Sequence, residues 1–218
     1  MSKVYSNAEA AFEDLYDKIN SEGVDFAGTK ALFNVGFYIE NPMLHAINTP
    51  WRKWNANYAK IEWQWYLSGD RSAVEIAKYA KIWYSCMDYK GEVNSNYGWH
   101  WQRNGQLKYV IEELKRNRES RRASITIYDA KDRYNFENDT PCTYAINFMI
   151  VDNKLNMSVM MRSNDLWYGF CNDQYCFSML QLTVANELDL AIGTYYHFTN
   201  NMHVYNKFLN KNINIKNS

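Results

Sequence analysis

The sequence lacks a charge excess of either sign, because its 24 basic and 24 acidic residues cancel in a chain of 218 residues. Proteins that bind a polynucleotide usually carry a basic excess or a basic stripe, and neither is visible, so we expect no polynucleotide partner. A mononucleotide needs only a local cluster of arginines, and neutrality does not argue against that.

Long apolar runs are also missing. No stretch approaches the ~18 apolar residues of a membrane span, so we expect no membrane partner. The amino-terminal segment, MSKVYSNAEAAFEDLYDKI, is charged throughout. It lacks the apolar stretch that a secretion signal peptide contains. We therefore expect a cytosolic protein.

Cysteine and histidine are scarce, with four residues of each. The spacing of Cys86, Cys142, Cys171 and Cys176 fits neither a disulfide framework nor a zinc site. The histidines show no metal-ligand pattern. We expect reduced thiols and no metal ion. A free cysteine is more often a small buried hydrophobe than a catalytic group.

Apolar residues, by contrast, make up 47% of the chain, and repeats, low-complexity stretches and linkers are absent. This predicts one domain over residues 1–218. Helical spacing predicts helices at 7–20 with Asn7 as N-cap, 58–67 ending at Gly69, 106–116, 176–189 and 201–209. Apolar and aromatic runs predict strands at 31–39, 124–128, 144–151, 155–161 and 194–199, with a hairpin turn at Asp152 and Asn153. The mixture predicts an α+β fold with an antiparallel-leaning sheet covered by helices.

Two features could supply reactive groups. Glu62 lies in the aromatic segment IEWQWY (61–66), where burial would raise its pKa and suit proton transfer; the alternative is an exposed position on an amphipathic helix. Cys142 follows Pro141 and precedes an apolar strand. It is either a core residue or a nucleophile, and a nucleophile needs a nearby cation to lower its pKa.

Two further features could bind a phosphate or another ligand. Arg121 and Arg122 precede a strand, and guanidinium groups match phosphate oxygens; the alternative is a solvated charge pair. Adjacent strand residues point to opposite faces, so one chain would not readily use both arginines on one ligand. Arg162, Ser163 and Asp165 end another apolar strand. They form either a ligand site or a capped turn before the next helix.

Taken together and in this order, these segments resemble the thymidylate synthase superfamily. The resemblance covers residues 62–205 and rests on Glu62 with LSGD (67–70), NYG (96–98), SRR (120–122), Pro141-Cys142, Arg162-Ser163 with Asp165 and Gly169, and His203 with Tyr205. It implies a thymidylate synthase-like fold and a sheet-mediated homodimer. In such a dimer each nucleotide site takes Arg121 and Arg122 from the other subunit.

Within that superfamily the chain is more similar to the deoxycytidylate hydroxymethylases of the T-even phages, in KGEVNSNYGW (90–99), MRSND (161–165) and GFCND (169–173). Counted without gaps from Arg162, Asp173 falls where thymidylate synthases place an asparagine. An ionised aspartate only accepts hydrogen bonds, so it suits the N4 amino group of cytosine and repels O4 of uracil. Asn172 is adjacent, and a slip of one residue would reverse this inference.

The resemblance implies a role for each site residue. The Cys142 thiolate adds to C6 of the base, Arg162 assists, and C5 attacks the methylene carbon of 5,10-methylenetetrahydrofolate, the expected cosubstrate. Water then adds to give a 5-hydroxymethyl group. The remaining implied roles are water ordering and proton relay for Glu62, removal of the C5 proton for Tyr97, folate binding for Asp165 and Trp83, phosphate binding for Arg121, Arg122, Arg162 and Ser163, and sugar binding for His203 and Tyr205.

Three alternatives stay open. The first is a deoxyuridylate hydroxymethylase or thymidylate synthase, against which Asp173 argues. The second is an enzyme of cytidine monophosphate, since no residue is assigned to the 2′-hydroxyl. The third is an inactive nucleotide-binding module, which the presence of Cys142, Glu62 and Asp173 disfavours.

Overall fold

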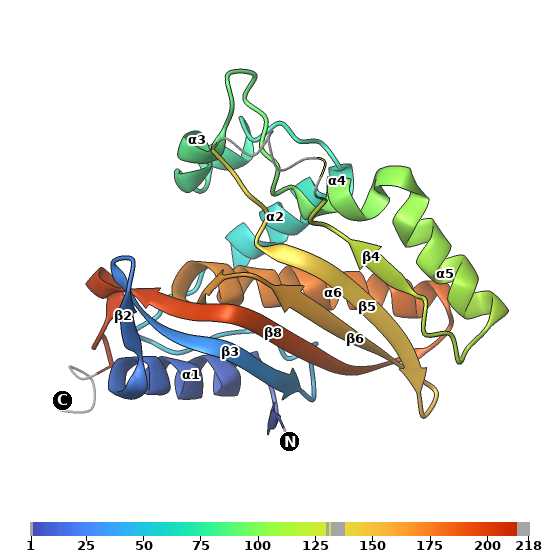
Figure 1. Ribbon diagram of the computed structural model, residues 1–218, viewed down its shortest axis with the longest axis horizontal. Helices are drawn as coiled ribbons and strands as arrows, with labels where there is room; N and C mark the ends of the chain where they lie inside the picture. The colour runs from blue at the N-terminus through green and yellow to red at the C-terminus, as the bar shows by residue number, and fades with distance from the viewer. Residues whose placement is uncertain (1, 130, 132–137, 213–218) are drawn as a thin grey trace.

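The computed structural model describes residues 2–129, 131 and 138–212. In chain order its strands and helices are β1 (Lys3–Tyr5), α1 (Ala8–Glu22), β2 (Val24–Phe26), β3 (Thr29–Ile39), α2 (Ala56–Ser68), α3 (Ile82–Cys86), α4 (Tyr97–Gln102), α5 (Gln106–Arg116), β4 (Ser124–Thr126), β5 (Thr143–Val151), β6 (Lys154–Met161), β7 (Asn164–Asp165), α6 (Cys171–Glu187) and β8 (Ala191–Tyr205). Figure 1 traces them. None of these helices is long and apolar enough to cross a membrane.

The strands form one mixed sheet in the order β1-β3-β8-β6-β5-β4, with β2 attached to β3 and β7 attached to β8. The pairs β2–β3, β3–β8, β5–β6 and β4–β5 are antiparallel. The pairs β1–β3, β6–β8 and β7–β8 are parallel. The predicted α+β class with a mixed, antiparallel-leaning sheet is therefore confirmed.

Helices α1 and α6 cover the same face of the sheet, because both pack on β8 and on each other. Figure 1 shows α6 behind the central strands and the opposite face of the sheet turned to the viewer. Alternation along β6 follows this layering: Leu155, Met157 and Val159 are buried, and the residues between them are half-buried. The other face carries exposed side chains such as Tyr144 of β5.

Local signals in the sequence account for several element ends. The Asn7 side chain accepts a hydrogen bond from the Ala10 amide at 2.9 Å and caps α1. Helix α2 ends at Gly69, whose φ of 63° is left-handed. Asp152 and Asn153 both have positive φ, which matches the twist of the β5–β6 hairpin. These three predictions are confirmed.

Two predictions about the carboxyl-terminal part of the chain are corrected. The helix predicted at 176–189 begins earlier, at Cys171, where it continues a π-helical turn, Leu166–Phe170. The helix predicted at 201–209 is wrong. Strand β8 runs on to Tyr205, and only a 3₁₀ turn, Asn206–Phe208, follows it. Pairing with β3 along almost the whole strand outweighs the helical spacing of the apolar residues.

A close approach of two helices explains the segment Asn96-Tyr97-Gly98. Asn96 caps α4 by accepting a hydrogen bond from the Trp99 amide at 2.8 Å. A Cβ on Gly98 would lie 1.6 Å from the carbonyl oxygen of Tyr66, so only glycine lets α4 pack on α2. The result is that Tyr97 is buried against the same helix that carries Glu62.

Candidate active site

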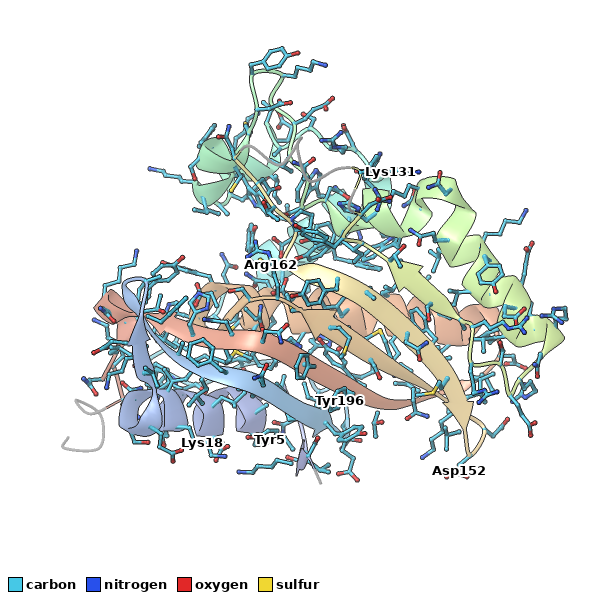
Figure 2. All side chains as sticks on the ribbon, in the orientation of Figure 1. Tyr5, Lys18, Lys131, Asp152, Arg162 and Tyr196 are labelled. Carbon is cyan, nitrogen blue, oxygen red and sulfur yellow. The ribbon has the colours of Figure 1, made fainter. Side chains whose placement is uncertain are left out.

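Cys142 and Arg162 face each other at the open end of the β5–β6 pair. Cys142 precedes β5, Arg162 follows β6, and the Arg162 amide donates to the Cys142 carbonyl at 2.7 Å. The Arg162 guanidinium donates to the carbonyl oxygens of Pro141 at 3.1 Å and Thr140 at 2.7 Å. Arg162 therefore holds the segment that directly precedes Cys142 in place. Figure 2 shows Arg162 at the end of the hairpin opposite Asp152.

The Cys142 thiol is half-buried. Burial raises the pKa of Cys142 to about 11, although the charge of Arg162 acts in the opposite direction. The charges of Asp173 and Asp139 raise this pKa further. The charge of Arg162 therefore favours the thiolate, but burial dominates, and in the free chain the thiol stays protonated at neutral pH.

Glu62 lies on α2 and is only 5% exposed. Its Oε1 accepts a hydrogen bond from the Tyr58 hydroxyl at 2.8 Å. Burial, and then the charge of Asp173, raise the pKa of Glu62 to about 8. The exposed alternative for Glu62 is therefore wrong, and the carboxyl group can hold or release a proton near neutral pH.

Asp173 lies in the first turn of α6, where its Oδ2 accepts a hydrogen bond from the Asn164 side-chain amide at 2.7 Å. A Cβ on Gly169 would lie 2.9 Å from Asn164 Nδ2 and 3.2 Å from Asp173 Oδ2, so a larger residue there would displace this contact. Burial raises the pKa of Asp173 to about 7, and the bond from Asn164 opposes that rise.

The side chain of Asn172, the residue before Asp173, forms its hydrogen bonds with other partners. Its Oδ1 accepts a hydrogen bond from Trp54 Nε1 at 2.9 Å, and its Nδ2 donates to the Tyr168 carbonyl at 3.0 Å. Asp173, in contrast, interacts electrostatically with both Glu62 and Cys142. Of the two adjacent residues, the aspartate is the one that interacts with Glu62 and Cys142.

Strand β8 carries His203 and Tyr205 to the same region. The short β7 pairs with β8 in the register Asp165 to His203, so the Arg162-Ser163 corner lies next to these residues. His203 and Tyr205 stand on one face of β8, with ring centroids 5.5 Å apart, while Val204 between them is buried. Burial, and then the charge of Arg162, lower the pKa of His203.

Tyr97 packs between Tyr66 and Phe177. Burial raises the pKa of Tyr97 well above its ordinary value, and the charges of Cys142 and Asp173 raise it further. The hydroxyl group therefore lies near the thiol and is protonated at neutral pH, which favours hydrogen-bond donation over proton abstraction in the free chain.

Asp165 and Trp83 are both constrained by their neighbours. The Asp165 side chain accepts a hydrogen bond from the Trp167 amide at 2.8 Å, so the predicted capped turn is present. Burial raises the pKa of Asp165 to about 6, against the charge of Arg52. Trp83 is 9% exposed, and its indole N–H donates to the Tyr58 hydroxyl at 2.9 Å.

Comparisons with known proteins identify the family to which this fold and site belong. The family model for thymidylate synthase matches residues 11–216. The chain belongs to the thymidylate synthase family. The sheet and its helical cover are thus those of a thymidylate synthase fold.

The relatives include enzymes with different pyrimidine substrates. The chain is 35% identical over 161 residues to the deoxycytidylate 5-hydroxymethyltransferase of Enterobacteria phage T4, covering 69% of this chain and 63% of that protein. It is 31% identical over 169 residues to the deoxyuridylate hydroxymethyltransferase of Pseudomonas phage M6, covering 74% and 48%. It is 25% identical over 220 residues to the thymidylate synthase of Fusobacterium nucleatum, covering 92% and 80%. The chain therefore matches less than two thirds of the length of the phage relatives.

Arg121 and Arg122 lie far from the Cys142 of their own chain. Both are exposed, just before β4, and the Ala123 carbonyl accepts a hydrogen bond from the Phe148 amide. Phe148 is six residues beyond Cys142 along β5, a separation of about 20 Å at ~3.3 Å per residue. The two arginines are therefore outside the cluster that the other site residues form.

Four residues of the site region escaped the sequence analysis. Tyr58 and Asn164 contact Glu62 and Asp173. Asp139 accepts hydrogen bonds from the Ser95 amide at 2.6 Å and hydroxyl at 2.7 Å. The fourth, Arg52, is 8% exposed and donates to the Trp167 carbonyl at 2.7 Å. Two of them had a usable signal: Tyr58 precedes Glu62 by one helical turn, and Asn164 lies within the segment MRSND (161–165).

Metal binding has no support in the part of the chain that the structure describes. No group of three or more His, Cys, Asp or Glu side chains in these ranges could hold an ion.

Proposed function

We propose that the chain is a deoxycytidylate 5-hydroxymethyltransferase, which converts dCMP, 5,10-methylenetetrahydrofolate and water into 5-hydroxymethyl-dCMP and tetrahydrofolate. The observation that carries this proposal is the Asp173 carboxylate, held by Asn164 at 2.7 Å. A carboxylate accepts a hydrogen bond from the N4 amino group of cytosine and has no donor for O4 of uracil. Sites that hydrogen-bond a specific group can reject its analogue by ~10⁴-fold or more.

The cysteine step begins at the Cys142 sulfur, which adds to C6 of the base and makes C5 nucleophilic. Because burial keeps the thiol protonated in the free chain, the thiol must lose its proton before or as the sulfur attacks C6. Arg162 follows β6 and bonds to the segment that carries the sulfur. A pair of further cations, Arg121 and Arg122, would add positive charge at the phosphate. Later departure of the sulfur from C6 restores the aromatic ring.

Glu62 and Asp173 would carry out the proton transfers of the reaction. Their charges repel across a buried region, and both pKa values are raised, so near neutral pH the pair holds a proton that neither carboxylate would retain in water. This proton can be donated as charge builds up on N3 of the ring. Glu62 in its ionised form then activates the water that adds to the C5 methylene group.

The folate cosubstrate supplies the one-carbon unit. C5 of the base would bond to its methylene carbon and then lose its proton, and the bond from that carbon to the folate nitrogen would break, which releases tetrahydrofolate and leaves the C5 methylene group. Asp165 and Trp83 are the residues proposed to hold it, and two observations fit that role. The Asp165 carboxyl group is buried with a raised pKa of about 6, so it can accept or donate a hydrogen bond to a heterocycle. The Trp83 indole N–H is already bonded to Tyr58, so folate would contact the ring of Trp83 and not its N–H group.

A homodimer is part of this proposal. The roughly 20 Å between the arginine pair and Cys142 along β5 leaves Arg121 and Arg122 without a role in their own site. The sheet face opposite α1 and α6 exposes Tyr38 and Tyr144, and Tyr38 packs on Tyr196 at 4.7 Å. A second copy bound to this face would cover these aromatic residues and bring each arginine pair to the other subunit.

One observation favours deoxyuridylate as the second candidate substrate. With a pKa of about 7, Asp173 is protonated in a large fraction of molecules at neutral pH, and a protonated carboxyl group can donate to O4 of uracil. One of the phage relatives is named as a deoxyuridylate enzyme.

Tritium release and product mass test the proposal directly. The protein is incubated with methylenetetrahydrofolate and either dCMP or dUMP labelled with tritium at C5. We expect release from dCMP and a product heavier than dCMP by one CH₂O group. Release from dUMP alone would contradict the cytosine assignment, and a methyl group in the product would indicate reduction in place of hydration.

A further inference from the structure

A chain of two hydrogen bonds leads from α3 to the buried carboxyl group of Glu62. The Trp83 indole Nε1 donates to the Tyr58 hydroxyl oxygen at 2.9 Å, and the Tyr58 hydroxyl donates to Glu62 Oε1 at 2.8 Å. Tyr58 and Glu62 lie one turn apart on α2, so the helix itself keeps the second bond short.

The chain runs from Trp83 toward Glu62. An indole nitrogen only donates, so the Tyr58 oxygen must accept from Trp83. The hydroxyl group has one proton of its own, and Glu62 Oε1 at 2.8 Å is the acceptor that satisfies it in this buried site. A proton bound to Glu62 is then confined to the other oxygen, Oε2.

We propose that Tyr58, held in place by Trp83, is a positioning residue that reserves Oε1 of Glu62 as an acceptor and leaves Oε2 as the oxygen that exchanges protons in the reaction. This inference rests on the proposed function of Glu62 as a proton-transfer group. It adds a role for Trp83 within the protein, besides the proposed contact with folate.

The surroundings of Glu62 make this single bond important. Among the residues that the structure describes, the other titratable groups that interact with Glu62 are Asp173 and Cys176 on α6 and Tyr66 on α2. None of them carries a positive charge. The Tyr58 hydroxyl is the group that lowers the pKa of Glu62, against burial and the charge of Asp173. Without it, the carboxyl group would stay protonated to higher pH.

The test measures the titration of Glu62 by ¹³C NMR on protein labelled at glutamate carboxyl carbons, with the signal assigned by its loss in Glu62→Gln. In Tyr58→Phe, which removes one oxygen atom, we expect the midpoint to rise by about 1 to 2 pH units. Trp83→Phe should raise it less, because the Tyr58 hydroxyl loses its fixed orientation. Tyr84→Phe is the matched control on α3: its side chain is exposed, and the midpoint should not move.

A second measurement uses the unaltered protein. The Trp83 indole ¹H–¹⁵N resonance, two hydrogen bonds from the carboxylate, should shift with the same midpoint as Glu62. An indole resonance that is insensitive to this titration, or an unchanged Glu62 midpoint in folded Tyr58→Phe, would overturn the proposal.

Kinetics distinguish this proposal from the proposed function. Tyr58→Phe should lower kcat by about tenfold and move its pH profile upward, while KM for the nucleotide changes little, since the bond acts on proton transfer and not on binding. If the wild-type protein turns over no pyrimidine nucleotide, the proposed function fails, but the NMR titrations still decide whether Tyr58 and Trp83 control Glu62.

Discussion

The Asn164 side-chain amide donates to Oδ2 of Asp173 at 2.7 Å, across a gap that Gly169 keeps open. The bond stabilises the ionised form of a carboxyl group that burial would otherwise keep neutral. Asn164 thus influences the ionisation of Asp173, the side chain that is proposed to distinguish cytosine from uracil. Its other amide atom, Oδ1, is buried with no hydrogen-bond partner in the described ranges, which leaves one acceptor unused beside the site.

Replacing Asp173 by asparagine should reverse the choice of base. Asparagine offers both a donor and an acceptor, which match O4 and N3–H of uracil. We expect Asp173→Asn to lose dCMP turnover by about 100-fold or more and to gain activity on dUMP. Tritium release from each nucleotide measures the change.

Asn172→Ala is the neighbouring control for this substitution. Its side chain bonds to Trp54 and to the Tyr168 carbonyl, so its loss should leave the ratio of dCMP to dUMP activity unchanged. A change of base preference in Asn172→Ala, with none in Asp173→Asn, would mean that the wrong residue has been assigned.

The preference for dCMP should increase with pH. Asp173 is protonated below its pKa of about 7 and ionised above it, and only the ionised form excludes O4 of uracil. In Asn164→Ala the carboxylate loses its donor, its pKa rises, and the whole curve should move to higher pH. The ratio of kcat/KM for the two nucleotides, measured between pH 6 and 9, tests both statements. A ratio independent of pH would contradict them.

Glu62→Gln should stabilise the fold at alkaline pH while it abolishes turnover. The pKa of Glu62 is raised from 4.5 to about 8 by folding, so unfolding releases a proton in this window. Stability linked to this group is fully present below pH 4.5 and is lost as pH rises toward 8. Glutamine cannot ionise. The melting temperature of Glu62→Gln should therefore exceed that of the wild type at pH 8 and match it at pH 4.5, as calorimetry would measure.

Much of the fold follows from local patterns in the sequence. Caps such as Asn7 and the turn at Asp152 and Asn153 act within a few residues, so they predict element ends well. The stretch 201–205 shows the limit of this approach. Its apolar spacing suits a helix, yet it becomes strand because β3 and β7 offer backbone partners that lie far away in the sequence.

The site, like the fold, depends partly on local sequence signals and partly on contacts between distant residues. The sequence motifs name Cys142, Glu62, Asp173 and Arg162, and the fold brings them to one end of the sheet. The contacts that set their proton affinity come from residues such as Asn164, whose importance depends on a three-dimensional approach at Gly169. The raised pKa of Cys142 was also not predictable, because burial outweighs the charge of Arg162.

Cys142 should be a slow nucleophile in the absence of nucleotide. With a pKa of about 11, its alkylation by iodoacetamide should accelerate about tenfold per pH unit from pH 7 to 9. Mass spectrometry of the labelled peptide separates this site from Cys86, and Cys142→Ser provides the blank. A reaction rate that levels off below pH 8 would show that the thiolate forms more easily than its burial implies.

Two inactive variants should restore activity to each other if the arginine pair acts across a dimer. One carries Arg121→Ala with Arg122→Ala, and the other carries Cys142→Ala. In a mixed dimer, one site combines an intact Cys142 with intact arginines from the partner. Random assortment places half of the chains in mixed dimers, so about a quarter of the wild-type activity should return. If both arginines served the site of their own chain, every site would lack one component, and mixing would restore nothing. Sedimentation of the mixture confirms that dimers form, and each variant alone gives the baseline.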